Sequence, residues 1–431
     1  MDAAVLEVHG LVVDERWLAD RALERVLRRE RRLWASERRA VAESFYGLVR
    51  WRGQLEWLLG SGGYAGPAPR RDPATLYAAW MVRFGGQDPA GAARRLGVPP
   101  AALEGLARAG ARIAAIADPV ERLAAEASLP VWIAGRFAAE LGLEEARALA
   151  QAMNRRAPLT VRANLLRGTR HELRERLLAE GVAAEPTPHS PWGLTLDGRA
   201  NAFALRAFKD GLFEIQDEGS QLLALACGAR PGWTAVDACA GAGGKSLALA
   251  AEMRNKGSLH ALDVDADRLQ EARRRARRAG VHNLRTRIVP AAGAEAEAAT
   301  ADLQGEADLV LVDAPCSGLG TLRRKPDARW RLELGDPERF AARQRELAAR
   351  FARLVRPRGR FVYATCAVGR TENEEVAAFL AAETGLAPLP VERALGAELA
   401  RALGAEGHLL RLLPHRHGTD GFFVASFERV R

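Results

Sequence analysis

The second half of the chain alternates short apolar runs with helical segments, and this alternation restricts the fold more than any other feature. The runs that we expect to be strands are 234–238, 258–262, 285–289, 307–312 and 360–364. Strands that alternate with helices form crossover units with a mostly parallel sheet. A final apolar run at 421–427 predicts one more strand, antiparallel, at the end of that sheet. Residues 216–431 are therefore predicted to form an α/β domain.

The first part of the chain has a helical pattern instead. Apolar residues recur at helical spacing from about residue 14 to 60, with Asp14 and Ser36 placed as caps, and 74–125 is again helical in character. A Gly/Pro-rich loop is expected at 60–69. A small mixed unit follows, with helices at 131–141, 144–154 and 171–180 and a strand at 159–164. The predicted domains are 1–125, all helical, 126–215, small α+β, and 216–431, α/β.

Composition narrows the class of protein. A chain of 431 residues, 48% hydrophobic and 27% charged, can bury two or three cores. Its start lacks the basic and apolar stretches of a secretory signal, and no run is long and apolar enough to cross a bilayer. Four cysteines are too few for a disulfide framework. We therefore expect a cytoplasmic protein with free thiols and no membrane partner.

The formal net charge of +9 favours a polyanionic partner, because binding to phosphates releases counterions. General use of arginine in place of lysine explains the same charge, so charge alone does not decide. The arginines of the first two predicted helices form either an RNA-facing surface or a solvated helix face. They are Arg21, Arg25, Arg28, Arg29, Arg31, Arg32, Arg38 and Arg39.

A loop of small residues follows the first predicted strand. It comprises Cys239, Ala240, Gly241, Ala242, Gly243 and Gly244, and leads through Lys245 into a helix. Small residues at such a turn let a ligand touch the backbone. Asp263 ends the second strand nineteen residues past Gly244, close to the spacing at which an acid meets a ribose hydroxyl in doubly wound folds. The loop and the acid together predict a nucleoside-containing ligand.

Three ligands compete for this corner. A phosphate-binding loop for a nucleoside triphosphate needs its first glycine where Cys239 stands, so that match fails. A dinucleotide motif needs a third glycine where Ser246 stands, which weakens that match too. S-adenosylmethionine needs no pyrophosphate site, only close backbone approach and an acid for the ribose. It fits best.

Two cysteines stand just beyond the carboxyl ends of strands, where open parallel sheets hold their ligands. Cys316 follows Asp313 after the fourth strand, and Cys366 follows the fifth. If those strands are neighbours, both thiols face one crevice. A disulfide is the alternative, and we consider it the weaker one in a cytosolic chain.

Two thiols and a carboxyl beside a methyl donor suit methylation of cytosine at carbon 5. A thiolate that adds at carbon 6 activates carbon 5, and a carboxyl hydrogen-bonded at ring nitrogen 3 stabilises the accumulating charge. A second polar group, for which Cys316 is a candidate, assists the later release of the sulfur. The residues alone do not decide which thiol attacks.

With these residues, the chain resembles the Fmu/Sun (NOL/NOP-type) family of RNA cytosine-C5 methyltransferases, including its bacterial 16S ribosomal RNA enzymes. The resemblance covers about the last three hundred residues, and the helical front resembles NusB-type RNA-binding modules. The motifs that carry it lie at 128–132, 215–221, 239–245, 313–316, 323–327, 365–366, 372–374 and 420–423. It implies a Rossmann-like, S-adenosylmethionine-dependent methyltransferase domain, an all-α NusB-like N-terminal domain and a small α+β linking subdomain. The implied partner is RNA, namely 16S rRNA or a small-subunit assembly intermediate.

The resemblance also implies roles for individual residues. Cys366 is the attacking thiolate, Cys316 assists release, Asp313 lies between cofactor and base, and Lys245 lies near the reaction centre. The cofactor is held by the loop from Cys239 to Lys245, with Asp263, Arg268 and Asp313. Two departures stand out: the loop has Gly241 and Ala242 where the family has alanine and proline, and 290–293 lacks the acid that usually meets the adenine.

Outside this centre, Arg323, Arg324 and Lys325 form either a charged surface loop or, as we favour, contacts to RNA phosphates. His415 and His417 lack a third ligand nearby, so we expect pairing with the strand turn and no metal. Three alternative functions remain: a non-catalytic RNA-binding assembly factor, a cytosine methyltransferase acting on tRNA, and a nucleotide hydrolase.

Overall fold

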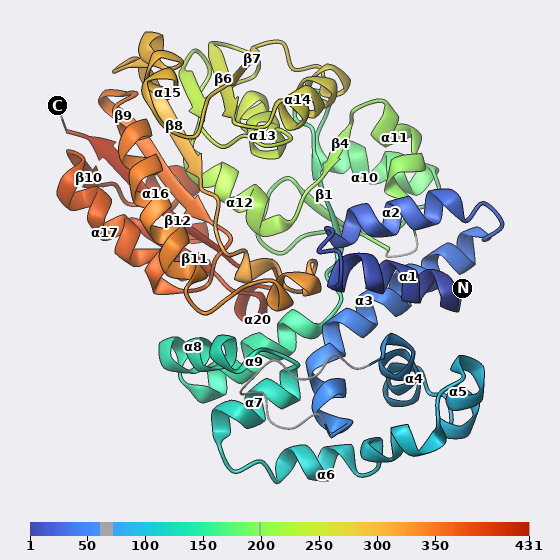
Figure 1. The fold of residues 1–431 in the computed structure, drawn as a ribbon. Helices are drawn as coiled ribbons and strands as arrows, with labels where there is room; N and C mark the ends of the chain where they lie inside the picture. Colours follow the sequence, from blue (N-terminus) through green and yellow to red (C-terminus); the bar gives the residue numbers. More distant parts are fainter. Residues whose placement is uncertain (61–71, 198–199, 431) are drawn as a thin grey trace. The chain divides into compact units, whose positions relative to one another are not determined.

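The computed structural model describes residues 1–60, 72–197 and 200–430, so the predicted loop at 60–69 falls almost wholly outside the described residues. The chain forms two compact units (Figure 1). The helical unit contains 1–156 together with 321–334, and the catalytic unit contains 157–320 and 335–431. Among the described residues, no helix is long and apolar enough to cross a membrane. The division into three domains at 125 and 215 stays a prediction.

The helical unit is built from α-helices with 3-10 turns at Pro100–Leu106 (η1) and Pro326–Trp330 (η5). Its helices are α1 Asp2–Val13, α2 Ala19–Arg29, α3 Ala35–Leu58, α4 Pro73–Arg83, α5 Pro89–Leu96, α6 Ala109–Ala114, α7 Pro119–Ala127, α8 Val131–Leu141 and α9 Leu143–Asn154. One core joins the first five, centred on fully buried residues such as Val8, Phe45 and Leu48. The expected helices are confirmed in kind.

Two details of the helical prediction are wrong. Helix α1 was not predicted, although its buried positions Val5, Val8 and Val12 recur at helical spacing. The expected caps also differ. Asp14 ends α1, and α3 begins at Ala35 after Trp34 rather than after a cap at Ser36.

The segment 321–334, which we call the strap, folds with the helical unit although it lies far along the sequence. Arg329 is fully buried. Its Nη1 donates to the carbonyl of Ser128 at 3.1 Å and to Oδ1 of Asn154 at 3.0 Å. Nε1 of Trp330 donates to the carbonyl of Val49 at 2.7 Å. These bonds tie the strap to α3, α9 and the end of α7.

The catalytic unit begins with an antiparallel sheet in the order β2-β3-β1-β4, flanked by α10 (Arg170–Ala179) and α11 (Arg206–Lys209). Its strands are β1 Leu159–Ala163, β2 Ala184–Pro186, β3 Gly193–Leu196 and β4 Phe213–Ile215. The prediction identified β1 and α10 and missed the other three strands, each of which has only three or four residues. Runs that short carry little alternation to read.

The main sheet has eight strands, seven of them in the order β10-β12-β9-β8-β5-β6-β7, with β11 also paired to β12. They are β5 Thr234–Asp237, β6 Ser258–Asp263, β7 Leu284–Ile288, β8 Ala307–Asp313, β9 Val355–Thr365, β10 Leu386–Pro388, β11 Leu409–Leu412 and β12 Phe422–Arg429. Strands β5 to β9 pair in parallel, which confirms the predicted Rossmann-like sheet. Strand β12 is antiparallel as predicted, but it is not the end of the sheet, because β10 and β11 pair with it.

Helices cover both faces of this sheet (Figure 1). Alternate residues of each strand point to opposite faces, so Leu309 and Leu311 enter one core while Val310 and Val312 enter the other. The helices of this unit are α12 Glu218–Cys227, α13 Gly244–Glu252, α14 Ala266–Ala279, α15 Ala294–Ala298, α16 Asp336–Ala352, α17 Glu374–Glu383, α18 Glu392–Leu395, α19 Ala397–Ala402 and α20 Pro414–His417. Burial on both faces explains why the central strands read as continuous apolar runs.

Candidate active site

The loop of small residues turns from the end of β5 into α13, as predicted. Gly241 and Gly243 have φ values of 52° and 80°, which L-residues rarely adopt. A Cβ at Gly243 would lie 2.9 Å from Cβ of Ala272, so this glycine lets the loop pack on α14. A Cβ at Gly241 would meet nothing within 4 Å. The backbone of the loop therefore borders open space at Gly241, where a ligand can approach it.

Asp263 closes the loop from the neighbouring strand. Its Oδ2 accepts a hydrogen bond from the amide of Gly241 at 2.7 Å, and its Oδ1 accepts one from the amide of Asp265 at 2.9 Å. Each carboxylate oxygen has two lone pairs, so both retain capacity for a ribose hydroxyl. Arg268, by contrast, is exposed on α14 and pairs with Asp265 at 3.4 Å.

Two apolar side chains stand exposed beside Asp263. Val264 follows it and is 58% exposed, and Ile288, which is opposite Asp263 in the β6–β7 register, is 55% exposed. Sequence reasoning did not single out either residue. In the sequence, Val264 shows only as an apolar residue next to the acid expected to bind ribose, and Ile288 only as an apolar residue near the end of the next predicted strand. Exposed apolar side chains at such a place suit a flat heterocycle.

Asp237, at the end of β5, is a third residue that the sequence prediction missed. Its carboxyl is 1% exposed and accepts a hydrogen bond from Oγ of Ser246 at 2.6 Å, while Oδ1 has no partner among the described residues. Burial raises the pKa of Asp237 to about 6.

Lys245 and Asp313 form an ion pair, with Nζ and Oδ2 at 2.6 Å, and so connect α13 to the end of β8. Burial alone would lower the pKa of Lys245, but the Asp313 carboxylate reverses this and the net direction is upward. The ammonium group also lies 5.6 Å from the ring centroid of Phe422. Lys245 is thus held as a cation beside an anionic carboxylate.

Cys316 and Cys366 are brought together as predicted, because β8 and β9 are neighbours. Their sulfur atoms are 3.3 Å apart, and both are free half-buried thiols rather than a disulfide. The hydrogen bond with Cys366, and then burial, raise the pKa of Cys316 well above its usual value. Cys316 therefore keeps its proton, and either of the two sulfur atoms can be the donor in the hydrogen bond between them.

A buried polar cluster holds the loops on which the two cysteines stand. Glu372 accepts from the amide of Ser317 at 2.8 Å and from its Oγ at 2.5 Å, and Nε2 of Gln344 donates to the same carboxylate at 3.1 Å. The hydroxyl of Tyr363 donates to the carbonyl of Glu372 at 2.6 Å. The segment with Glu372 was part of the motif noted in the sequence, but this positioning role was not predicted.

The other proposed contacts are more dispersed. In the strap, Arg323 is buried, Arg324 is half-buried and Lys325 is exposed, so these three differ in what they can offer a phosphate. Nδ1 of His417 accepts from the amide of Leu413 at 2.9 Å, which is the expected pairing with the strand turn. The catalytic, cofactor-binding and RNA-binding roles of individual residues stay predictions.

Comparison with known proteins gives consistent matches. The family model described as 16S rRNA methyltransferase RsmB/F matches residues 224–428, and that of the RsmF/B-like ferredoxin-like domain matches 129–202. The probable ribosomal RNA small subunit methyltransferase B of Bacillus subtilis is 36% identical over 318 residues, covering 73% of this chain and 69% of the relative. Its counterpart from Synechocystis is 28% identical over 434 residues, covering 95% of each.

Solved structures agree with the fold. The crystal structure of PH0851 has a TM-score of 0.77 and 26% identity, covering 99% of this chain and 97% of that one. A methyltransferase homologue from Pyrococcus horikoshii has a TM-score of 0.59 and 27% identity, covering 73% of this chain and all of its own.

Proposed function

Because the chain belongs to the 16S rRNA methyltransferase RsmB/F family, whose methyl donor is S-adenosylmethionine, we propose that it methylates carbon 5 of a cytosine in 16S rRNA. The reaction passes through a covalent bond between Cys366 and carbon 6 of that base. The observation that carries this proposal is the pair of free thiols 3.3 Å apart, beyond the ends of adjacent parallel strands.

The residues at the loop fit the cofactor. Open space at Gly241 and the carboxylate of Asp263 suit the amino-acid and ribose portions. When bound, S-adenosylmethionine supplies an electrophilic methyl group. Val264 and Ile288 would offer apolar contacts to the adenine, in place of the acid that 290–293 lacks. The remaining residues of the predicted cofactor site are Cys239, Ala240, Ala242, Gly243, Gly244, Lys245, Arg268 and Asp313.

The thiolate of Cys366 adds to carbon 6, and the displaced electron pair spreads over carbon 5 and the ring nitrogen. Lys245, kept protonated by Asp313, supplies the positive charge that this ring needs, and Asp313 orients the base. Once carbon 5 carries the methyl group, its hydrogen leaves as a proton and the bonding electrons expel the sulfur. Cys316 assists this release by hydrogen-bonding the departing thiolate.

The test is methyl transfer to defined RNAs. Purified protein is incubated with labelled S-adenosylmethionine and 16S rRNA, a small-subunit assembly intermediate or total tRNA, and the products are read by bisulfite sequencing. We expect 5-methylcytosine at one position of 16S rRNA. Methylation of tRNA alone would replace the substrate, and absence of 5-methylcytosine from every RNA at saturating cofactor would refute the proposed chemistry. Absence of methylation from every RNA would favour the alternative function, an RNA-binding assembly factor without activity.

A further inference from the structure

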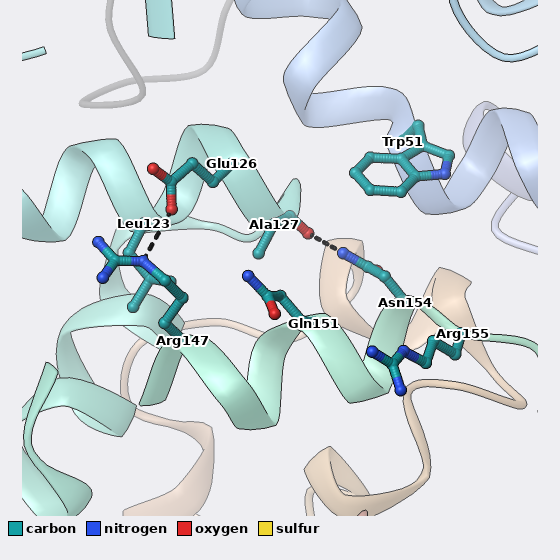
Figure 2. Close-up of a pocket in the computed structure, with 8 residues that line it drawn as sticks. All are labelled: Trp51, Leu123, Glu126, Ala127, Arg147, Gln151, Asn154 and Arg155. Carbon is teal, nitrogen blue, oxygen red and sulfur yellow. Dashed lines mark hydrogen bonds and ion pairs between the residues drawn. The ribbon is translucent and has the colours of Figure 1, made fainter. Parts of the chain in front are cut away.

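A cavity lies wholly within the helical unit, between α3, α7 and α9 (Figure 2). Its volume is about 260 Å³, which is enough for a nucleobase with part of its sugar. The residues that line it are Trp51, Leu123, Glu126, Ala127, Arg147, Gln151, Asn154 and Arg155. None of them belongs to the loop or to the cysteine pair described above.

One wall of this cavity is aromatic and apolar. The indole of Trp51 stacks on Phe84, with ring centroids 4.6 Å apart and planes 20° apart, and Phe84 is not part of the lining. The stacked partner thus holds the indole of Trp51 in place at the cavity without itself lining it. Buried Leu123 and Ala127 continue the apolar surface from α7. An immobilised aromatic ring with apolar neighbours is a stacking platform.

The opposite side carries polar groups that the fold does not use. Gln151 and Arg155 are exposed, and neither side chain has a hydrogen bond or ion pair within the part of the chain that the structure describes. Figure 2 shows Gln151 between Arg147 and Asn154 on α9. Its amide offers both a donor and an acceptor to the edge of a base, and the guanidinium of Arg155 offers charge to a phosphate.

The floor of the cavity is fixed before any ligand arrives. Nδ2 of Asn154 donates to the carbonyl of Ala127 at 2.7 Å, drawn dashed in Figure 2. Nη1 of Arg329 in the strap donates to Oδ1 of Asn154 at 3.0 Å. Arg147 is anchored to Glu126 at 3.1 Å and to Glu144 at 2.9 Å. A preformed pocket loses little entropy when it binds.

We propose that this cavity holds one unstacked nucleobase of the substrate RNA, as a second RNA-binding site apart from the methylation centre. The proposal rests on the RNA substrate of the proposed function. A stacking ring, an amide that can read a base edge and a free guanidinium are the groups that single-stranded RNA requires. The net charge of +9 supplies the long-range attraction that brings such a strand to the surface.

The test uses exposed positions whose change leaves the core intact. Gln151→Ala removes the amide, and Arg155→Ala removes one charge from the lining. Arg156→Ala is the matched control, because this adjacent exposed arginine pairs with Glu43 at 3.0 Å and does not line the cavity. Trp51→Leu removes the ring, with its melting temperature measured alongside. The readouts are Kd for a 16S rRNA fragment, the split between KM and kcat, and photocrosslinking with 4-thiouridine-substituted RNA mapped by mass spectrometry.

We expect Gln151→Ala and Arg155→Ala each to raise Kd and KM about tenfold while kcat at saturating RNA is unchanged, as loss of one base contact implies. Arg156→Ala should change Kd by about twofold or less, and crosslinks should map to Trp51 or its neighbours. If Gln151→Ala binds like wild type and Arg155→Ala like Arg156→Ala, the cavity does not hold a base and the proposal is overturned. Binding is measured without cofactor, so a wild-type protein that binds RNA and leaves it unmethylated would refute the proposed function while the variants still test this cavity.

Discussion

The backbone amide of Gly320 donates a hydrogen bond to the carbonyl oxygen of Cys366 at 2.8 Å, so the loops that follow β8 and β9 are joined directly beside the two thiols. The carbonyl of Gly320 in turn accepts from the amide of Gly421 at 2.8 Å, which adds the turn before β12. A Cβ at Gly320 would lie 2.4 Å from the carbonyl oxygen of Gly421 and 2.7 Å from that of Cys366. Only glycine lets the three backbones meet.

Gly320→Ala is therefore expected to move Cys366 and to lower kcat about a hundredfold, because a displacement of about 1 Å costs that much in a positioned reaction. Single-turnover methylation and thermal unfolding measure the two effects. Gly110→Ala is the control, since a Cβ at this exposed position in α6 meets nothing within 4 Å and favours the helix. Equal activity of the two variants would show that the contact does not position Cys366.

Substitutions of the two cysteines are expected to have opposite effects on the covalent RNA adduct. Cys366→Ala should abolish turnover and give no covalent species, because no nucleophile remains for carbon 6. Cys316→Ala should accumulate an RNA adduct that survives denaturing electrophoresis, because departure of the Cys366 sulfur loses its hydrogen-bond donor. Cys227→Ala, at a buried cysteine in α12, serves as the control and should form and release the adduct as wild type does. An adduct with Cys366→Ala and none with Cys316→Ala would reverse the assigned roles.

The Lys245–Asp313 pair is expected to act as one unit. Lys245→Met should lower kcat about a hundredfold, because it removes the cation beside the base. Asp313→Asn should lower kcat similarly, and the double variant should be no worse than either single one. A double-mutant cycle on kcat measures this coupling. Strictly additive losses would mean that the two groups act independently.

The stability of the helical unit should fall in mild acid. Burial, and then the charge of Arg52, lower the pKa of His9 to about 4, and both ring nitrogens lack a partner among the described residues. Protonation is thus disfavoured in the fold relative to an unfolded pKa of about 6.5. The contribution of neutral His9 to the free energy of unfolding is fully present above pH 6.5. It is lost as the pH falls toward 4, by up to about 3 kcal/mol.

Thermal unfolding at pH 7.5 and pH 4.5, followed by circular dichroism, checks this expectation. His9→Leu should unfold at the wild-type temperature or slightly above it at pH 7.5, because an unpaired buried imidazole is replaced by an apolar group. At pH 4.5 the variant should be clearly more stable than wild type. A parallel loss of stability in both proteins would assign the acid sensitivity to other groups.

The sequence was most informative where burial is strongest. The five parallel strands were predicted to within a few residues, except that β9 starts at Val355. Four of them are largely buried and read as apolar runs, whereas β7, at the edge of the sheet, has no buried residue. Strands β2, β3, β4, β10 and β11 were missed, since each is three or four residues long. Their positions depend on pairing with partners such as β12, which is tertiary information.

The site divides in the same manner. Cys316, Cys366 and Asp313 were found because strand ends in a parallel sheet converge, so a linear pattern predicts proximity. Glu372 was not recognised as a positioning residue, because its partner Gln344 lies on α16, separated from it by β9. The affiliation of the strap with the helical unit was equally invisible, since it depends on the burial of Arg329 among oxygen atoms of two other segments, the end of α7 and the end of α9.

The strap also determines how this protein can be taken apart. Its two ends continue as Gly320 and Gly335 of the catalytic unit, while its middle encloses a charged guanidinium in the helical unit. A truncation that begins after residue 156 leaves Arg329 and Trp330 without Ser128, Asn154 and Val49. The helical unit is therefore not formed by the N-terminal residues alone, because it includes a segment inserted between two parts of the other unit. A domain exchange between homologues has to replace 1–156 and 321–334 together.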